Sequence, residues 1–357
     1  MNMQMNALAL PTVDEEIWRY SRIGELDLDS FKLGKLSTKI AASSAAKQIV
    51  SSTTNVVPRD ATDIFEDLNV RHAQLTAIST AKNQVVAEPI VITHSLDESG
   101  VVAYSRLVVE ADENSEVTIV ERFVSSADIN SLIVPVVDVR AAQSARVTYI
   151  AINELGSATW QIGYQQAVGQ RDSMMKLFTV ALGGDYARVR AEVRLEGQGA
   201  NSQQVALYFA DSTQMHDFRT LQDHAAPRTH SSLRFKGAVK DTAKSVYTGL
   251  IRIRENATKS EAFQTNRNLT LSNGAWAESV PNLEIETNDV KCSHASTVGP
   301  IDEDQRFYLE SRGIQPEIAE RLVVLGFFDE VLNRLPALPF IAGLRERVST
   351  KLLGAKS

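Results

Sequence analysis

Cysteine is almost absent from this chain. Its 357 residues contain one, Cys292, so no disulfide framework can form within it. A lone thiol also cannot hold an iron–sulfur cluster or a structural zinc ion, because such sites take about four ligands, mostly Cys or His. The composition therefore excludes a self-contained cluster or zinc protein.

Long apolar runs and a targeting signal are lacking too. The longest apolar stretches, 133–137 and 322–325, are far shorter than the ~20 residues of a membrane span. Residues 1–16 show neither a basic region nor a long apolar region of the secretory type. With 37 basic and 44 acidic residues the net charge is −7, which argues against nucleic-acid or anionic-membrane partners. We therefore expect a cytoplasmic protein.

Motifs of a self-sufficient enzyme are also missing. There is neither a Gly-x-x-x-x-Gly-Lys-Ser/Thr phosphate loop nor a Gly-x-Ser-x-Gly nucleophile turn. Gly197 and Gly199 lack the third glycine of a dinucleotide site, and Glu284 with Glu286 is typical of a solvated strand face. We expect a non-enzymatic protein that acts with partners.

The middle of the chain consists of short alternating segments. Residues 188–195 and 247–253 alternate apolar and polar side chains, which predicts strands with one buried face. About 200 residues of strands without helices must close on themselves or stack. The turn-like segment 241–245 recurs loosely at 256–260, as in a solenoid. A sandwich or barrel with two similar turns remains equally compatible with the periodicity.

Helical patterns flank this β region. Residues 14–49 and part of 60–78 are predicted to be helical, and a basic amphipathic tail covers 340–353. Asp302 and Gln305 resemble a capping box, Gly313 should end that helix, and Pro316 should begin the next. The predicted plan is an N-terminal helical region over 1–85, a β core over 86–289 and a C-terminal helical region over 290–357.

Two groups of residues could carry chemistry. Cys292 and His294 are two residues apart, so an extended segment would place both side chains on one face, where they could bind iron or zinc. Lys291, Gly299 and Pro300 around them suggest a junction between a strand and a helix. The alternative is a buried cysteine beside a surface histidine. A second cluster, at spacings unlike compact metal motifs, comprises His216, Asp217, Asp223, His224 and His230.

The C-terminal run from Lys291 to Leu309, followed by residues 311–314, resembles the signature of the SufB/SufD scaffold family of the SUF iron–sulfur assembly system. Residues 18–21, 223–231 and 266–269 resemble further elements of that family in the expected order, with Arg228 where a second histidine is usual. The match is closer to SufD: the cluster-associated cysteine of SufB falls near Thr265, and its acidic residue after the histidine falls at Ala295.

The resemblance implies a right-handed parallel β-helix with helical regions at both ends. It implies a complex with SufB and two copies of the ATPase SufC, in which the β-helix ends of SufB and SufD pair. His294 and Cys292 would then contribute to a transient cluster or iron site shared with SufB, with no cofactor held stably by this chain alone. The C-terminal helical region would dock SufC, and its candidate partner-binding residues are Phe307, Tyr308, Arg312 and Gly313.

The competing hypotheses are a SufB-like primary scaffold and a β-helix enzyme that acts on polysaccharide. Thr265 and Ala295 disfavour the first. The second usually has a secretion signal and an aromatic and carboxylate groove, whereas this chain has only 6% aromatic residues. The isolated chain could also form a homodimer.

Overall fold

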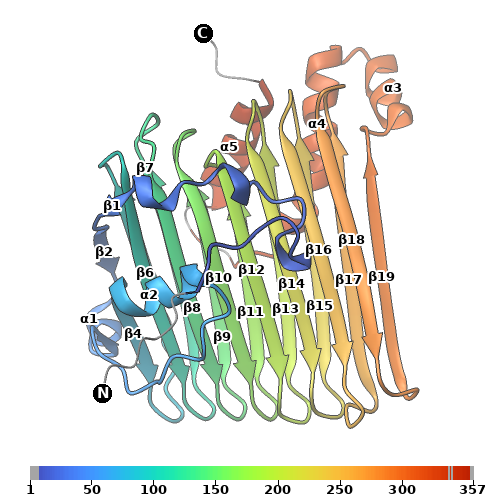
Figure 1. Ribbon diagram of the computed structural model, residues 1–357. Helices are drawn as coiled ribbons and strands as arrows, with labels where there is room; N and C mark the ends of the chain where they lie inside the picture. The colour runs from blue at the N-terminus through green and yellow to red at the C-terminus, as the bar shows by residue number, and fades with distance from the viewer. Residues whose placement is uncertain (1–7, 337, 339–340, 354–357) are drawn as a thin grey trace.

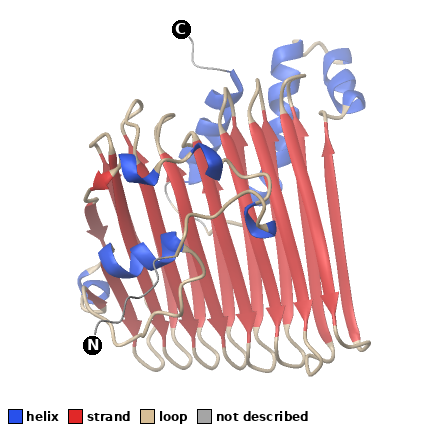
Figure 2. Ribbon diagram, in the orientation of Figure 1, coloured by secondary structure: helices blue, strands red, loops and turns tan. Residues whose placement is uncertain are grey.

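The computed structural model describes residues 8–336, 338 and 341–353, and it consists mainly of two facing β-sheets (Figures 1 and 2). Long strands alternate between the sheets along the chain. The first sheet contains β1 (Lys32–Leu33), β3 (Val50–Ser51), β4 (Gln74–Thr80), β6 (Val101–Ala111), β8 (Leu132–Ala141), β10 (Trp160–Gly169), β12 (Tyr186–Leu195), β14 (Met215–His224), β16 (Lys244–Ile253) and β18 (Trp276–Ile285). The second contains β2 (Ser37–Ala41), β5 (Ile90–Leu96), β7 (Glu116–Ser125), β9 (Arg146–Glu154), β11 (Met174–Ala181), β13 (Asn201–Ala210), β15 (His230–Val239), β17 (Ser260–Thr270) and β19 (Val290–Gly299).

Each turn of the coil adds one strand to each sheet. Tyr186 pairs with Met215 and Met215 with Lys244, so successive turns are 29 residues apart at this position. The strands from β4 to β19 pair in parallel, as expected when the chain always returns in the same direction. This arrangement is a parallel β-solenoid, which confirms the expected β-helix and excludes the sandwich and barrel.

The turns between strands stack as regularly as the strands. Asn114, Ser144, Asp172 and Arg228 occupy left-handed conformations at equivalent corners. The backbone N–H of Ser144 donates to Arg171 O, and that of Asp172 donates to Gln198 O, so each corner bonds to the next. Asn, Asp and Gly tolerate this conformation better than other residues. The repeated segments 241–245 and 256–260 are both such turns, but they lie half a coil apart.

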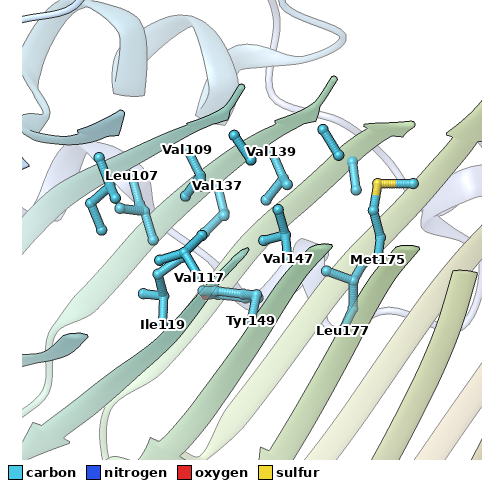
Figure 3. Packing of buried hydrophobic residues seen from close by; sticks show 14 of the residues in the cluster. Leu107, Val109, Val117, Ile119, Val137, Val139, Val147, Tyr149, Met175 and Leu177 are labelled. Carbon is cyan, nitrogen blue, oxygen red and sulfur yellow. The ribbon is translucent and has the colours of Figure 1, made fainter. Parts of the chain in front are cut away.

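Apolar side chains fill the space between the sheets. Figure 3 shows one such cluster, in which Leu107, Val137, Tyr149 and Met175 come from both sheets. Side chains on the outer sheet faces are often buried as well, because other segments cover them. Strand β14 is buried at nearly every position, and its sequence therefore does not alternate cleanly.

The N-terminal region is less helical than predicted. Residues 14–49 contain three short 3-10 helices, η1 (Glu16–Trp18), η2 (Ile23–Glu25) and η3 (Leu28–Ser30), the four-residue helix α1 (Ser44–Lys47) and the strands β1 and β2. Trp18 is buried against the first sheet, and Arg188 lies 4.0 Å from its ring centroid. Tertiary packing of these apolar residues overrides the helical pattern. The short helix expected within 60–78 is α2 (Ile64–His72).

The C-terminal helices are α3 (Glu303–Ser311), α4 (Pro316–Leu332) and α5 (Ile341–Leu353). The Asp302 carboxylate accepts from the backbone N–H groups of Asp304 and Gln305, and Gly313 follows α3 with φ +83°. The predicted cap, stop and proline start are therefore confirmed. Helices α4 and α5 pack on the outer face of the second sheet, where Phe328 and Val348 are buried. Within the described ranges, no helix is long and apolar enough to cross a membrane.

The expected boundary at residue 290 is wrong by one strand. The segment 290–299 is β19, which pairs along its length with β17, so the solenoid continues to Gly299 and the helices begin at Glu303. Residues 1–85 likewise include β1 to β4. The Phe340 start of the basic tail lies outside the described residues.

Candidate functional site

The solenoid is open at its C-terminal end. Strands β18 and β19 are the last members of their sheets, so each has a neighbour on one side only (Figure 1). Their free edges carry backbone N–H and C=O groups that another strand could pair with. This end is therefore able to pair with a strand of a second chain.

Cys292 and His294 belong to this last turn. Cys292 pairs in register with Ala262, and His294 pairs with Gln264. Both partners are buried between the sheets, and side chains in register on parallel strands share a face. Cys292 and His294 therefore face the interior of the coil at its open end. The prediction that they share one face is confirmed. The expected junction between a strand and a helix is present too, because β19 ends at Gly299 and α3 begins at Glu303, but Cys292 and His294 lie near the start of β19 and not at that junction.

The two side chains differ in environment. Cys292 is half-buried and packs against the apolar cluster of Ile251, Ile253, Ala257 and Ala262. This burial raises the pKa of its thiol, which disfavours the thiolate that binds metals. His294 is exposed, because no further turn covers it.

Other side chains complete this inner surface. Ser296 donates a hydrogen bond of 2.7 Å to Ser279 and so links β19 to β18 across the open end. Leu283, Ile285 and Val298 are large apolar residues that remain exposed there. A turn in the middle of the coil would bury such residues, so this end has the character of an uncovered core.

A second candidate surface lies on the C-terminal helices. Phe307 is 70% exposed and Tyr308 is 57% exposed, and the Arg312 guanidinium lies 5.1 Å from the Tyr308 ring centroid. A groove of about 970 Å³ runs between α3, α4 and the strand ends, lined among others by Lys236, Arg267, Asp302, Tyr308, Leu322 and Phe327. Gly313 has a backbone role, since its positive φ disfavours other residues.

The histidines of the second cluster do not lie together in the structure. His216 and His224 are buried at opposite ends of β14, and burial lowers the pKa of His216 to about 3 and that of His224 to about 4. His230 instead lies near the surface, 3.7 Å from a Glu261 oxygen. Among the residues that the structure describes, no three His, Cys, Asp or Glu side chains are grouped to hold a metal ion.

The chain is similar to known proteins over most of its length. A family model described as "SUF system FeS cluster assembly, SufBD core domain" matches residues 92–327, from β5 into α4. The chain belongs to the SufBD family. The match spans most of the solenoid, including the Cys292 to His294 segment.

Several members of the SufBD family are similar over much of their length. The iron–sulfur cluster assembly SufBD family protein of Mycobacterium tuberculosis (strain ATCC 25618 / H37Rv) is 34% identical over 98% of this chain and 90% of its own. The iron–sulfur cluster assembly protein SufD of Escherichia coli is 28% identical over 81% of this chain and 69% of its own. SufD of Bacillus subtilis is 30% identical over 71% and 59%, respectively.

Sequence reasoning missed several residues of the open end. Gln264, Ser279 and Ser296 lie on its inner surface beside or opposite His294. Gln264 and Ser279 belong to no recognised motif, and Ser296 lies within the run 291–309 but is not among the predicted site residues. Counting one turn of 30 residues back from His294 would have identified Gln264. Thr265 and Ala295, the two departures from the SufB pattern, are partners in register on the outer face.

Proposed function

We propose that this chain is a SufD-like, non-catalytic subunit of a cytoplasmic scaffold complex with SufB and the ATPase SufC. The open end of the solenoid is the observation that carries this proposal. It combines two free strand edges, exposed apolar residues and the inward-facing His294 in one place. A partner with a similar β-helix end, as SufB is expected to have, would cover all three.

The proposed chemistry of this end is a transient iron or iron–sulfur site shared with SufB. His294 supplies a ligand from this chain, and the partner would supply further ones, because no three His, Cys, Asp or Glu side chains are grouped to hold a metal ion within the described residues. The raised pKa of Cys292 and its apolar contacts support a packing role, so its ligand role is secondary.

The proposed SufC dock is the surface of α3 and α4. Exposed Phe307 and Tyr308 offer aromatic anchors of the kind that contribute strongly to protein interfaces. Helix α4 packs directly on strands β13 and β15, so a force on the helices reaches the solenoid. In this proposal, ATP-driven association of two SufC subunits rearranges the SufB contact and opens His294 to iron and sulfur.

One observation weighs against a SufB-like scaffold, and one experiment tests the polysaccharide enzyme. A SufB-like primary scaffold would need a thiolate near position 265, where this chain has a threonine. A polysaccharide enzyme should be active as the isolated chain. A lyase or hydrolase activity of the purified chain would therefore contradict our proposal.

Co-purification with SufB and SufC from the same organism tests the assignment. We expect wild-type protein and His294→Ala to form the complex equally, while His294→Ala lowers cluster assembly in cells. Ser293→Ala is the matched control, because Ser293 is an exposed neighbour on the same strand. Normal cluster assembly with His294→Ala would contradict the ligand role, and failure to bind SufC would reject the larger assignment.

The SufC dock has its own test. Phe307→Asp places a charge in the aromatic surface and should weaken SufC binding in a pull-down while SufB binding persists. Equal loss of both partners would point to unfolding, which the melting temperature would reveal.

A further inference from the structure

Gln264 is an anomaly in the interior of the solenoid. Its side chain is only 2% exposed, yet neither its amide oxygen nor its amide nitrogen has a hydrogen-bond partner within the described part of the chain. Leaving a buried polar group unpaired costs about 1–3 kcal/mol. A leucine of similar size would avoid this cost, so the glutamine is unfavourable for stability alone.

The position of Gln264 relates it to His294. Gln204, Leu233, Gln264 and His294 are successive partners in register on β13, β15, β17 and β19. Neighbouring strands lie about 4.8 Å apart, and side chains in register on parallel strands share a face. Gln264 is therefore the side chain directly beneath His294, and it is within reach of an ion held by that imidazole.

The opposite sheet leaves room for this amide. A Cβ atom on Gly249 would lie 2.5 Å from Gln264 Nε2 and 2.2 Å from the Tyr247 hydroxyl oxygen. Glycine at position 249 thus creates a hollow that holds the end of the Gln264 side chain. The hollow lies one turn inside the open end, because Gly249 pairs with Pro281 of the last strand, β18.

We propose that Gln264 binds, through its amide oxygen, the same metal ion as His294. This chain then contributes one nitrogen donor and one oxygen donor to the site. This inference rests on the proposed function, in which His294 is a ligand. Imidazole and carbonyl oxygen together suit a divalent cation such as ferrous iron, whereas cluster sites are dominated by thiolates. The remaining ligands come from the partner across the open end.

Cobalt(II) titration of the complex with the SufB partner, followed by its visible absorption, tests the donor role. Gln264→Leu should weaken cobalt binding about tenfold or more. Gln264→Glu should restore binding, since a carboxylate oxygen replaces the amide oxygen. Gln204→Leu is the matched control, because Gln204 is also buried with an unpaired amide oxygen but lies two strands further from His294. The complex that carries Gln204→Leu should bind cobalt with wild-type affinity.

The melting temperature of each variant separates this role from a structural one. Gln264→Leu should melt at the same temperature as the wild type or higher, because an unpaired polar group has been removed. Weaker cobalt binding without loss of stability supports the proposal. Wild-type affinity in Gln264→Leu, with His294→Ala still impaired, would overturn it and leave the proposed function intact. Wild-type affinity in both variants would overturn the ligand role of His294 as well.

Discussion

His224 illustrates how burial can dominate the pKa of a residue. Its imidazole is enclosed at the end of β14, where Nδ1 lies 2.7 Å from Thr229 Oγ1 and Nε2 lies 2.7 Å from Ser231 Oγ. Both neighbours are hydroxyl groups, which satisfy a neutral ring. Burial disfavours the charged form and lowers the pKa of His224 to about 4, from the usual 6.5.

This shift predicts a pH dependence of stability. Between pH 6.5 and about 4 the unfolded chain binds a proton at His224 that the folded chain does not, so stability falls as the pH falls through this window. The contribution is at most about 1.4 kcal/mol per pH unit. We expect His224→Gln to reduce the slope of the unfolding free energy in urea titrations across these pH values.

Ser231→Ala is the control for His224→Gln. It removes a hydrogen-bond partner of the ring without removing a titratable group. It should lower stability across the window and leave the slope nearly unchanged. An unaltered slope in His224→Gln would show that the folded chain protonates His224 as readily as the unfolded chain.

Helix α3 depends on its N-terminal cap more than on packing. None of its nine residues is buried, so burial contributes little to its stability. The Asp302 carboxylate accepts from the N–H groups of Asp304 and Gln305 at 3.0 and 3.2 Å. A cap of this kind is worth about 1 kcal/mol. Asp302 therefore stabilises the helix that carries Phe307 and Tyr308.

Removing the cap should loosen α3 alone. Asp302→Ala is expected to speed amide hydrogen exchange in residues 303–311 by roughly five-fold, the equivalent of about 1 kcal/mol, with little change in the solenoid. Asp302→Asn is the control, since Asn caps as well as Asp. If both variants exchange like the wild type, contacts of α3 with α4 hold the helix without the cap.

The first and last turns of the solenoid differ in whether further strands cover them. At the N-terminal end, β2 and β3 pair antiparallel with β5 and β4 and so close the first turn. At the C-terminal end, none of the strands that the structure describes covers the last turn, but Pro281 lies in the middle of the edge strand β18. The N–H groups of Trp276 and Glu286 point toward β16. Along a strand the backbone N–H groups point alternately to the two neighbouring sides, so the even-numbered residues of β18 direct theirs toward β16. The backbone at position 281 therefore faces the open edge, and because proline has no N–H it offers no donor there.

Pro281 should therefore limit unwanted pairing of the open end. Pro281→Val restores a donor and a strand-forming residue, and it should increase self-association in sedimentation velocity at equal concentration. Val280→Ala is the control, because the backbone of Val280 faces β16. Unchanged association in Pro281→Val would mean that the proline does not restrict pairing with a second copy.

The sequence predicted the β region well because alternation and polar turns are local signals. It also predicted the cap at Asp302, the stop at Gly313 and the start at Pro316, which depend on a few neighbouring residues. The helical prediction over 14–49 failed because the apolar residues Trp18 and Ile23 do not form one face of a helix. They cover the outer face of the first sheet.

The sequence by itself determined the strand content, the caps, the single thiol and the shared face of Cys292 and His294, since each follows from local geometry or counting. Only the tertiary structure decided that residues 290–299 form the last strand of the solenoid. It also decided that burial raises the Cys292 pKa, and that Gln264 lies beneath His294. These features depend on residues about 30 positions apart becoming neighbours, and the stacking of whole turns sets that distance.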